Sequence, residues 1–391
     1  MSYQDPYSQI PPPPTVAVTI RRSPQMSVMR LAFAIIGILI AMLLGLVVLL
    51  LIGIETGPVA LLIGLVTATI PVPLYVILVL WIDRYESEPP WMLAVAFFWG
   101  AFVAVFAAFL LNTLFGLIVS ALTNNLKAGE TFAAVISAPI VEECAKGFIL
   151  FIFFFAKKDE FDGVIDGIVY GSLVALGFAM TENIQYYGKA ALQGGGGLTL
   201  TLLIRGAFAP FSHPLFTSMT GIGLGLARQS NNLAVKIVTP ILGLLMAIFL
   251  HSIWNGSAAI FGGGAFIITY ILVMVPAFFI LLVVISLALR REGQVVTEFL
   301  RADCESGFLT KQEYEELCSI RGRMGASYNA LSRGGFQQWR NRMRFNQLAS
   351  ELAFHRSRVS RGVSTATKTL SELENVYLQE LQSLAQQARF R

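Results

Sequence analysis

The chain has 391 residues, of which 55% are hydrophobic and only 13% are charged. Its mean hydropathy of +0.67 excludes an ordinary soluble globular protein and predicts a polytopic membrane protein. Charge is divided unevenly: residues 290–391 hold 16 basic and 11 acidic groups, whereas residues 1–289 hold 12 basic and 13 acidic groups. We therefore expect a membrane domain at residues 29–290 and a basic cytoplasmic tail at residues 291–391.

A polar segment precedes the first hydrophobic run. Residues 1–28 include PPPP at 11–14, and the apolar run that follows is too long for the core of a signal peptide. We predict a disordered cytoplasmic N-terminus and then a first spanning helix.

Eight segments are long and apolar enough to cross a bilayer. They cover residues 30–53, 57–82, 91–121, 131–156, 163–189, 198–227, 233–259 and 265–289. Polar or turn-forming clusters separate them. The predicted fold is all-α, with about eight transmembrane helices and a helical C-terminal tail.

The loops predict the orientation. If the N-terminus is cytoplasmic, ten basic residues fall on the cytoplasmic side and only Lys127 and Lys189 fall on the outer side. By the positive-inside rule, this predicts a multi-pass plasma-membrane protein with both termini in the cytoplasm.

Ionisable side chains lie within four of the predicted spans, where each is costly unless it is paired or hydrated. Such groups can pair only to hold helices together, or they can form a functional site. At about 1.5 Å per residue, acids and imidazoles from four helices reach one band in the middle to outer half of the membrane, which favours a site. The candidates are Glu142, Glu143, Lys146, Asp166, Glu182, Arg205, His213 and His251.

Helical spacing suggests separate roles. Glu142 and Lys146 are four residues apart and share a face, whereas Glu143 points about 100° away. The expected arrangement is a Glu142–Lys146 ion pair with Glu143 as the free carboxylate, although the reverse assignment also fits. Asn255 lies four residues after His251, so its amide is expected to orient or complement that imidazole.

Three further features have structural alternatives. Arg205 is either a counter-ion for Glu182 or Glu142, or a side chain that snorkels outward. Asp166 lies near a helix start and is a supporting candidate for the site. The GIGLG sequence at 221–225 predicts close helix packing rather than nucleotide binding.

Glutamate and histidine at one depth suit two hydrolytic mechanisms. In the first, His213, His251 and a glutamate, for which Glu182 is the candidate, bind zinc while another glutamate takes a proton from water. In the second, which needs no metal, a desolvated glutamate activates water and His and Asn donors stabilise the oxyanion. A proton-coupled transporter could use the same side chains. The chain lacks an HExxH sequence, which weakens the zinc alternative.

Five stretches resemble the motifs of PrsW-type intramembrane proteases, which are related to the CAAX prenyl-protease and bacteriocin-processing superfamily. The resemblance covers about residues 80–260. The stretches are DRYESEPP (83–90), EECAK (142–146), DGIVYGSLVALGFAMTEN (166–183), HPLFTSMTG (213–221) and HSIWN (251–255).

This resemblance implies an intramembrane endopeptidase that cleaves membrane-anchored proteins, with regulators such as anti-sigma factors as the substrate class. By motif, Glu142 and Glu143 correspond to the paired acidic site, Glu182 to the second acidic position, and His213 and His251 to the two histidines. The family is usually placed among metallopeptidases, whereas the related CAAX prenyl-proteases are interpreted as metal-independent, with a similar His and Asn pattern. Both chemistries stay open, so Zn²⁺ is a candidate cofactor.

The tail is predicted to be helical. Thr310 and Glu313 fit a capping box, and nine arginines lie between Arg321 and Arg361. Because this segment follows the last span, anionic lipid headgroups are its expected partner, and no nucleic-acid-binding fold is visible. Heptad-like apolar residues suggest self-association or substrate docking: Leu370, Leu373, Tyr377, Leu381 and Leu384.

Overall fold

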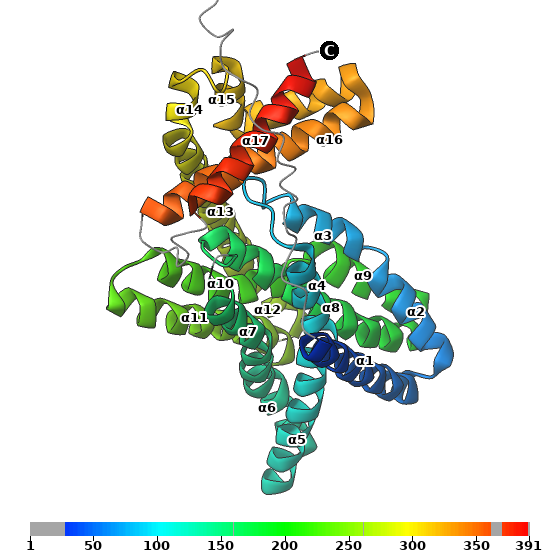
Figure 1. The fold of residues 1–391 in the computed structure, drawn as a ribbon. Coiled ribbons are helices and arrows are strands. Elements are labelled where there is room, and N and C mark those ends of the chain that lie inside the picture. The colour runs from blue at the N-terminus through cyan, green and yellow to red at the C-terminus, as the bar shows by residue number, and fades with distance from the viewer. Residues whose placement is uncertain (1–27, 159, 261, 361–369, 390–391) are drawn as a thin grey trace, which may run out of the picture.

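The computed structural model describes residues 28–360 and 370–389, except 159 and 261, and that part contains helices and no strands. The predicted N-terminal lead at residues 1–27 lies outside the described residues. Figure 1 shows a bundle of helices, with a helical cap on one end that follows α13. The all-α prediction is confirmed.

Thirteen α-helices form the bundle, and four π-helical segments lie between or within them. The bundle helices are α1 (Val28–Thr56), α2 (Pro58–Thr69), α3 (Val72–Leu80), α4 (Pro90–Phe98), α5 (Val105–Thr123), α6 (Leu126–Phe132), α7 (Ala138–Ala156), α8 (Val164–Leu192), α9 (Gly195–Leu202), α10 (Ser212–Gln229), α11 (Leu233–Ala259), α12 (Gly262–Thr269) and α13 (Val275–Phe299). The π-helical segments are η1 (Trp99–Ala104), η2 (Ala133–Ser137), η3 (Leu203–Phe208) and η4 (Tyr270–Met274). The cap contains α14 (Arg301–Glu305), α15 (Lys311–Leu317), α16 (Ile320–Ser360) and α17 (Leu370–Arg389).

Within the described chain, six stretches are long and apolar enough to cross a membrane. They correspond to six of the eight predicted segments: Leu31–Thr56, Pro58–Leu80, Pro90–Thr123, Val164–Leu192, Leu233–Ala259 and Gly264–Phe299. The other two predicted segments are also helical, but they hold charged site candidates and are interrupted. Residues 131–156 contain η2, and residues 198–227 are broken between η3 and α10.

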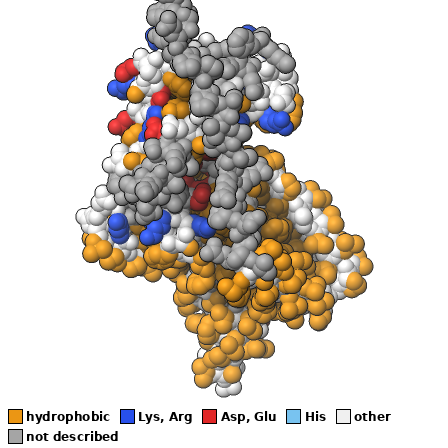
Figure 2. Space-filling view, in the orientation of Figure 1, with side chains coloured by type: hydrophobic (Ala, Val, Ile, Leu, Met, Phe, Trp, Pro, Cys, Tyr) orange, Lys and Arg blue, Asp and Glu red, His pale blue; other side chains and the backbone are white. Residues whose placement is uncertain are grey.

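The loops predicted to be cytoplasmic lie together at the end of the bundle that carries the cap. Arg358 of α16 bonds to Glu86 (2.9 Å) and Asp162 (3.1 Å), which belong to two different loops. At the opposite end, Lys189 pairs with Glu55 at 2.7 Å. Figure 2 shows hydrophobic side chains over the bundle and Lys and Arg near its junction with the cap. The loops that hold Glu86 and Asp162 therefore lie at the cap end, and Glu55 and Lys189 lie at the other end.

Helix α8 is the centre of the bundle. In its most apolar 18-residue window 94% of the residues are buried, against 11–22% in the other five candidate spans. It touches α10 through backbone atoms: a Cβ atom at Gly167 would lie 2.1 Å from the Gly221 carbonyl oxygen. Only glycine permits this approach, so the prediction that GIGLG is a packing surface is confirmed.

The π-helical segments η1, η2 and η3 each have a carbonyl group bonded by a side chain from another helix. A π turn leaves backbone carbonyls without their usual partner, and a membrane interior offers no water to replace it. The bonds run from Thr181 to Ala101 (2.8 Å), from Asn255 to Ala134 (2.9 Å) and from Tyr75 to Gly206 (2.5 Å). The bonds to η2 and η3 lie directly before the site helices α7 and α10, and the bond to η1 lies before α5.

Five arginines of the cap bond to other groups of the protein. Arg323 donates to backbone carbonyls, including that of Leu317 at 2.8 Å. Four others bond to carboxylates: Arg342 to Glu316, Arg344 to Glu380, Arg356 to Asp303 and Glu374, and Arg358 to Glu86 and Asp162. These five residues therefore have partners within the protein, and anionic lipid headgroups stay a predicted partner of the segment.

Other features of the cap agree with the sequence in part. The capping box of Thr310 and Glu313 opens α15, as predicted. In α17, Leu381 and Ala385 are buried in the core that also includes Leu348 of α16. The described part of the α17 stripe is thus used for packing within the chain, whereas the side chains of Leu370 and Leu373 lie outside the described residues.

Candidate active site

Glu143 of α7 is the most completely bonded acid of the site. Its Oε1 atom lies 2.9 Å from Lys146 Nζ and 2.9 Å from His251 Nδ1, and its Oε2 atom accepts a hydrogen bond from Thr217 at 2.8 Å. The side chain has no solvent exposure. The expectation that Glu143 is the free carboxylate is therefore wrong.

Lys146 pairs with both glutamates. Its Nζ atom lies 3.2 Å from Glu142 Oε2 as well as 2.9 Å from Glu143 Oε1. The i−4 and i−3 positions are both within reach of one side chain on a helix, which is why the expected separation of roles fails. The ammonium also approaches His213 Nδ1 at 3.3 Å and lies over the Phe178 ring.

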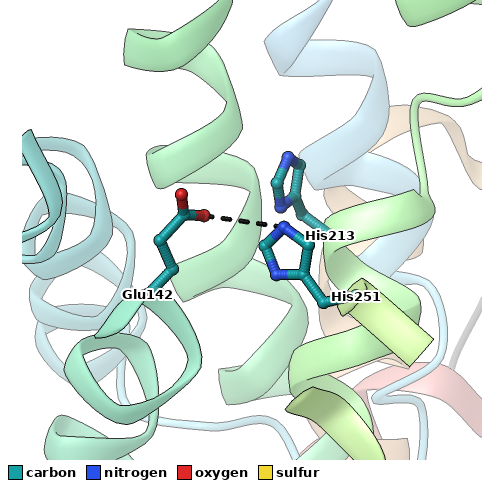
Figure 3. Close-up of side chains that lie close together, drawn as sticks. All are labelled: Glu142, His213 and His251. Atoms are coloured by element: carbon teal, nitrogen blue, oxygen red, sulfur yellow. Dashed lines mark ion pairs between the residues drawn. The ribbon is translucent and has the colours of Figure 1, made fainter. Parts of the chain in front are cut away.

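Glu142 is the carboxylate that faces the two imidazoles. Figure 3 shows its side chain, from α7, directed toward His213 of α10 and His251 of α11. Its Oε2 atom lies 3.8 Å from His251 Nε2, and its side chain keeps 7% exposure. Glu142 is therefore close to both histidines and, unlike Glu143, is not completely shielded from solvent.

His213 is bonded to a second acidic centre. Its Nε2 atom lies 3.0 Å from Glu182 Oε2, and Glu182 also forms an ion pair with Arg205. Arg205 bonds in turn to Asn183 and lies over the ring of Tyr186. The counter-ion alternative for Arg205 is thus confirmed, with Glu182 as its partner.

The neighbours of each imidazole indicate its tautomer. His251 faces Glu143 with Nδ1, and His213 faces Glu182 with Nε2, so each donates one ring N–H to a carboxylate. The remaining nitrogens, His251 Nε2 and His213 Nδ1, turn toward Glu142 and Lys146. Imidazoles held by carboxylates in this way are typical of metal sites.

Within the described residues, one group of acids and imidazoles could hold a metal ion: Glu142, His213 and His251. One ligand atom from each lies within 4.8 Å of the others. Two nitrogens and one carboxylate oxygen form a donor set that zinc accepts. The sequence-based set, with Glu182 as the third ligand, is corrected, because Glu182 instead bonds the far side of His213 and Arg205.

Asn255 and Asp166 make contacts that differ from the predicted ones. Asn255 donates to the Ala134 carbonyl in η2, and no described contact joins its amide to His251. Asp166 accepts hydrogen bonds from the backbone of Asp162 and Gly163, which caps the start of α8. Both residues therefore hold the framework rather than the reacting groups.

The DRYESEPP loop is anchored to α8. Tyr170 of α8 donates to Glu88 Oε2 at 2.5 Å, and the backbone N–H of Glu88 donates to Asp83 at 2.9 Å. Burial, followed by the negative charges of Asp166 and Asp83, raises the pKa of Glu88 to about 12. Glu88 is therefore neutral at physiological pH, and it joins the loop to the helix that carries Glu182.

Thr217 is a site residue that the sequence reasoning did not select. It is fully buried and donates to Glu143. The available signal was its position four residues after His213, which places both on one face of α10.

Comparison with known proteins supplies the family. Residues 88–281 match the model of a family described as PrsW family intramembrane metalloprotease. The chain is 33% identical over 177 residues to Protease PrsW of Bacillus subtilis, covering 44% of this chain and 72% of the relative. It is 31% identical over 170 residues to Protease PrsW of Oceanobacillus iheyensis, covering 43% and 71%. The chain belongs to the PrsW family of intramembrane proteases.

The match places the four site helices α7, α8, α10 and α11 inside the PrsW region. Protease PrsW of Geobacillus kaustophilus is similar to the chain at 31% identity over 175 residues, covering 44% of this chain and 69% of the relative. No solved structure matches the chain significantly. Membership of the PrsW family favours proteolysis over the proton-coupled transporter that the same side chains would also serve.

Proposed function

We propose that this intramembrane protease cleaves membrane-anchored proteins at a centre formed by Glu142, His213 and His251. The observation that supports it most is the convergence of two imidazoles, each held by its own carboxylate, on Glu142, whose side chain keeps 7% exposure. Ion pairs that only joined helices would not need two oriented imidazole nitrogens.

In this proposal Glu142 accepts a proton from the attacking water. The contacts described for it use only Oε2, so its other oxygen is left for water. The buried cation of Lys146 offsets part of the cost of burying an ionised Glu142. Glu142 then returns the proton to the leaving amine, as a general base that becomes a general acid.

The remaining residues position these groups. Glu143, fixed by Thr217 and Lys146, holds His251. Glu182, fixed by Arg205, holds His213. Loss of such an orienting partner typically costs about 10–100-fold in metal affinity or activity.

A divalent metal fits this donor set, with His213, His251 and Glu142 as the residues that would hold it. Zinc bound there would act as a Lewis acid toward water and the scissile carbonyl. Lys146 Nζ lies within 3.3 Å of two members of the set, so the ammonium occupies neighbouring space and offsets the same negative charge. Metal-independent hydrolysis would need the site-facing nitrogen of His213 or His251 to be protonated, so that the imidazolium can donate to the oxyanion.

We further propose the orientation and division of the chain. The cap and its adjoining loops, including residues 291–391, lie in the cytoplasm with both termini, and residues 29–290 form the plasma-membrane protease domain. The proposed substrate class is membrane-anchored regulators such as anti-sigma factors. Because the apolar stripe of α17 is used internally, self-association through that stripe is not part of this proposal.

The test is cleavage of a tagged, single-span anti-sigma factor by purified protein in liposomes. Wild type is expected to release a fragment whose mass places the cut within or beside the membrane segment. His213→Ala and His251→Ala should release none, while Lys189→Met, which changes a lysine at the opposite end of the bundle, should cleave normally. Cleavage at the wild-type rate by both histidine variants would contradict the assignment of the site.

A further inference from the structure

An apolar groove lies beside the active-site helices. It has a volume of about 930 Å³ and is lined by α3, α8, α10 and α13, with Leu78, Ile168 and Leu282 among its residues. At the end away from the cap it reaches Pro214 and Leu215, which directly follow His213. A ligand in this groove would therefore pack against the helix that carries a site histidine.

The groove has the length of one leaflet. Phe278 and Arg290 both line it and are twelve residues apart on α13, a distance of about 18 Å along a helix. Half of a bilayer's hydrocarbon core is about 15 Å thick. The groove thus runs from the bundle interior to the junction with the cap, where the polar region begins.

Basic side chains gather at the end of the groove that lies next to the cap. Arg84, Arg290 and Arg321 line it there. Arg290 and Arg321 are exposed, and neither has an ion pair or hydrogen bond among the described residues. The Nη2 atom of Arg84 is buried and likewise lacks a hydrogen-bond partner in the described chain. These residues contrast with the arginines of the cap that bond to carboxylates.

An aromatic side chain lies at the same end of the groove. Trp81 is 56% exposed, and the Arg84 guanidinium lies 3.1 Å from the centroid of its ring. Tryptophan is enriched where membrane proteins meet the headgroup region. The cap end of the groove therefore combines an interfacial aromatic residue with positive charges that form no ion pair among the described residues.

We propose that this groove binds one anionic phospholipid, with its phosphate at Arg84, Arg290 and Arg321 and its acyl chains along α3 and α13. Guanidinium groups bind phosphate oxygens through paired, charge-assisted hydrogen bonds, and basic pockets between membrane helices select anionic headgroups. The walls are mostly apolar and match hydrocarbon, although a few polar side chains such as Ser286 and Gln294 also line them. The lipid closes the groove beside α10 and supports the position of His213.

The test is lipid binding by native mass spectrometry of the purified full chain, titrated with phosphatidylglycerol or phosphatidylcholine. Wild type is expected to retain one phosphatidylglycerol and to bind phosphatidylcholine about tenfold more weakly, since one charge-assisted hydrogen bond is worth roughly that factor. The double variant Arg290→Gln/Arg321→Gln should lose this preference. Arg333→Gln, which removes an exposed cap arginine outside the groove, should keep it.

A second variant tests the position of the acyl chains. Leu282→Trp fills the groove without changing charge and should weaken binding of both lipids. Equal affinities for the two lipids in wild type, or unchanged phosphatidylglycerol binding in the double arginine variant, would overturn the proposal. It would also be overturned if Leu282→Trp kept lipid binding and lost only cleavage, because the groove would then receive the substrate's membrane segment. The binding readout needs no proteolysis, so it stands apart from the proposed function.

Discussion

Glu142→Gln is expected to lower kcat/KM for cleavage of a membrane-anchored substrate by about 10²–10⁴-fold, the range that a positioned acid–base group contributes. The amide keeps the shape of the side chain but cannot accept the proton from water. Its hydrogen bond with Lys146 can persist, so the fold should be retained. Single-turnover cleavage in liposomes, measured beside the thermal transition of each variant, checks both parts.

Two other glutamate variants make this prediction specific. Glu143→Gln should lower the rate by about 10–100-fold, because it only positions His251. Glu130→Gln alters an exposed glutamate of α6 and should cleave at the wild-type rate. A larger loss for Glu143→Gln than for Glu142→Gln would assign the proton transfer to Glu143 instead.

Lys146→Met is expected to destabilise the protein by about 3–5 kcal/mol, the usual cost of removing one partner from a buried ion pair. Lys146 is fully buried, and it is within bonding distance of two carboxylates and one imidazole. Methionine has a similar length but no charge, so Glu142 and Glu143 would repel each other without compensation. Thermal unfolding in detergent, followed by tryptophan fluorescence, measures the change.

Lys189→Met is the matched control for Lys146→Met. The Lys189–Glu55 pair has a shorter distance of 2.7 Å, but both side chains are about 45% exposed (45% and 44%), so its removal should cost no more than about 1 kcal/mol. If Lys146 acts through the glutamates, adding Glu143→Gln to Lys146→Met should recover part of the loss. If both lysine variants lowered the free energy of unfolding by the same amount, the buried ion pair would stabilise the protein no more than the exposed one.

The spans could be predicted because hydrophobic length alone identifies them. The predicted segment 233–259 coincides with α11, whereas segment 265–289 ends ten residues before α13 does. Helix α13 continues past Arg290 as far as Phe299, at the start of the cap. Over these residues the hydropathy falls, but the backbone stays helical. The break before Ser212 was missed, because the run 198–227 stays apolar through Ala209 and Phe211 while their backbone leaves the helix.

The site residues could be predicted as a group but not as individual contacts. Their common depth follows from helical rise, and it brought Glu142, Glu182, His213 and His251 together. Which carboxylate meets which imidazole depends on how α7 is rotated against α10 and α11. That rotation is set by η2 and by backbone contacts between helices, which a single sequence does not encode in its spacing.

The cap shows the same limit for charge. Nine arginines in 41 residues predicted a surface for anions, but four of them pair with acids elsewhere in the chain, such as Glu86 and Asp162 for Arg358. A count of charges cannot reveal such pairing. Arg321 of this segment and Arg290 before it have no described partner, and their common place became visible only through the groove that they border.

The most direct measurement determines metal content and cleavage in one detergent-purified sample of wild type and His251→Ala. The account predicts about one zinc per wild-type chain together with cleavage of the anchored substrate. In His251→Ala both should be lost, while the thermal transition stays close to that of wild type. Normal cleavage by His251→Ala, or a wild-type protein that binds no metal and cuts no substrate, would contradict a hydrolytic centre at Glu142, His213 and His251.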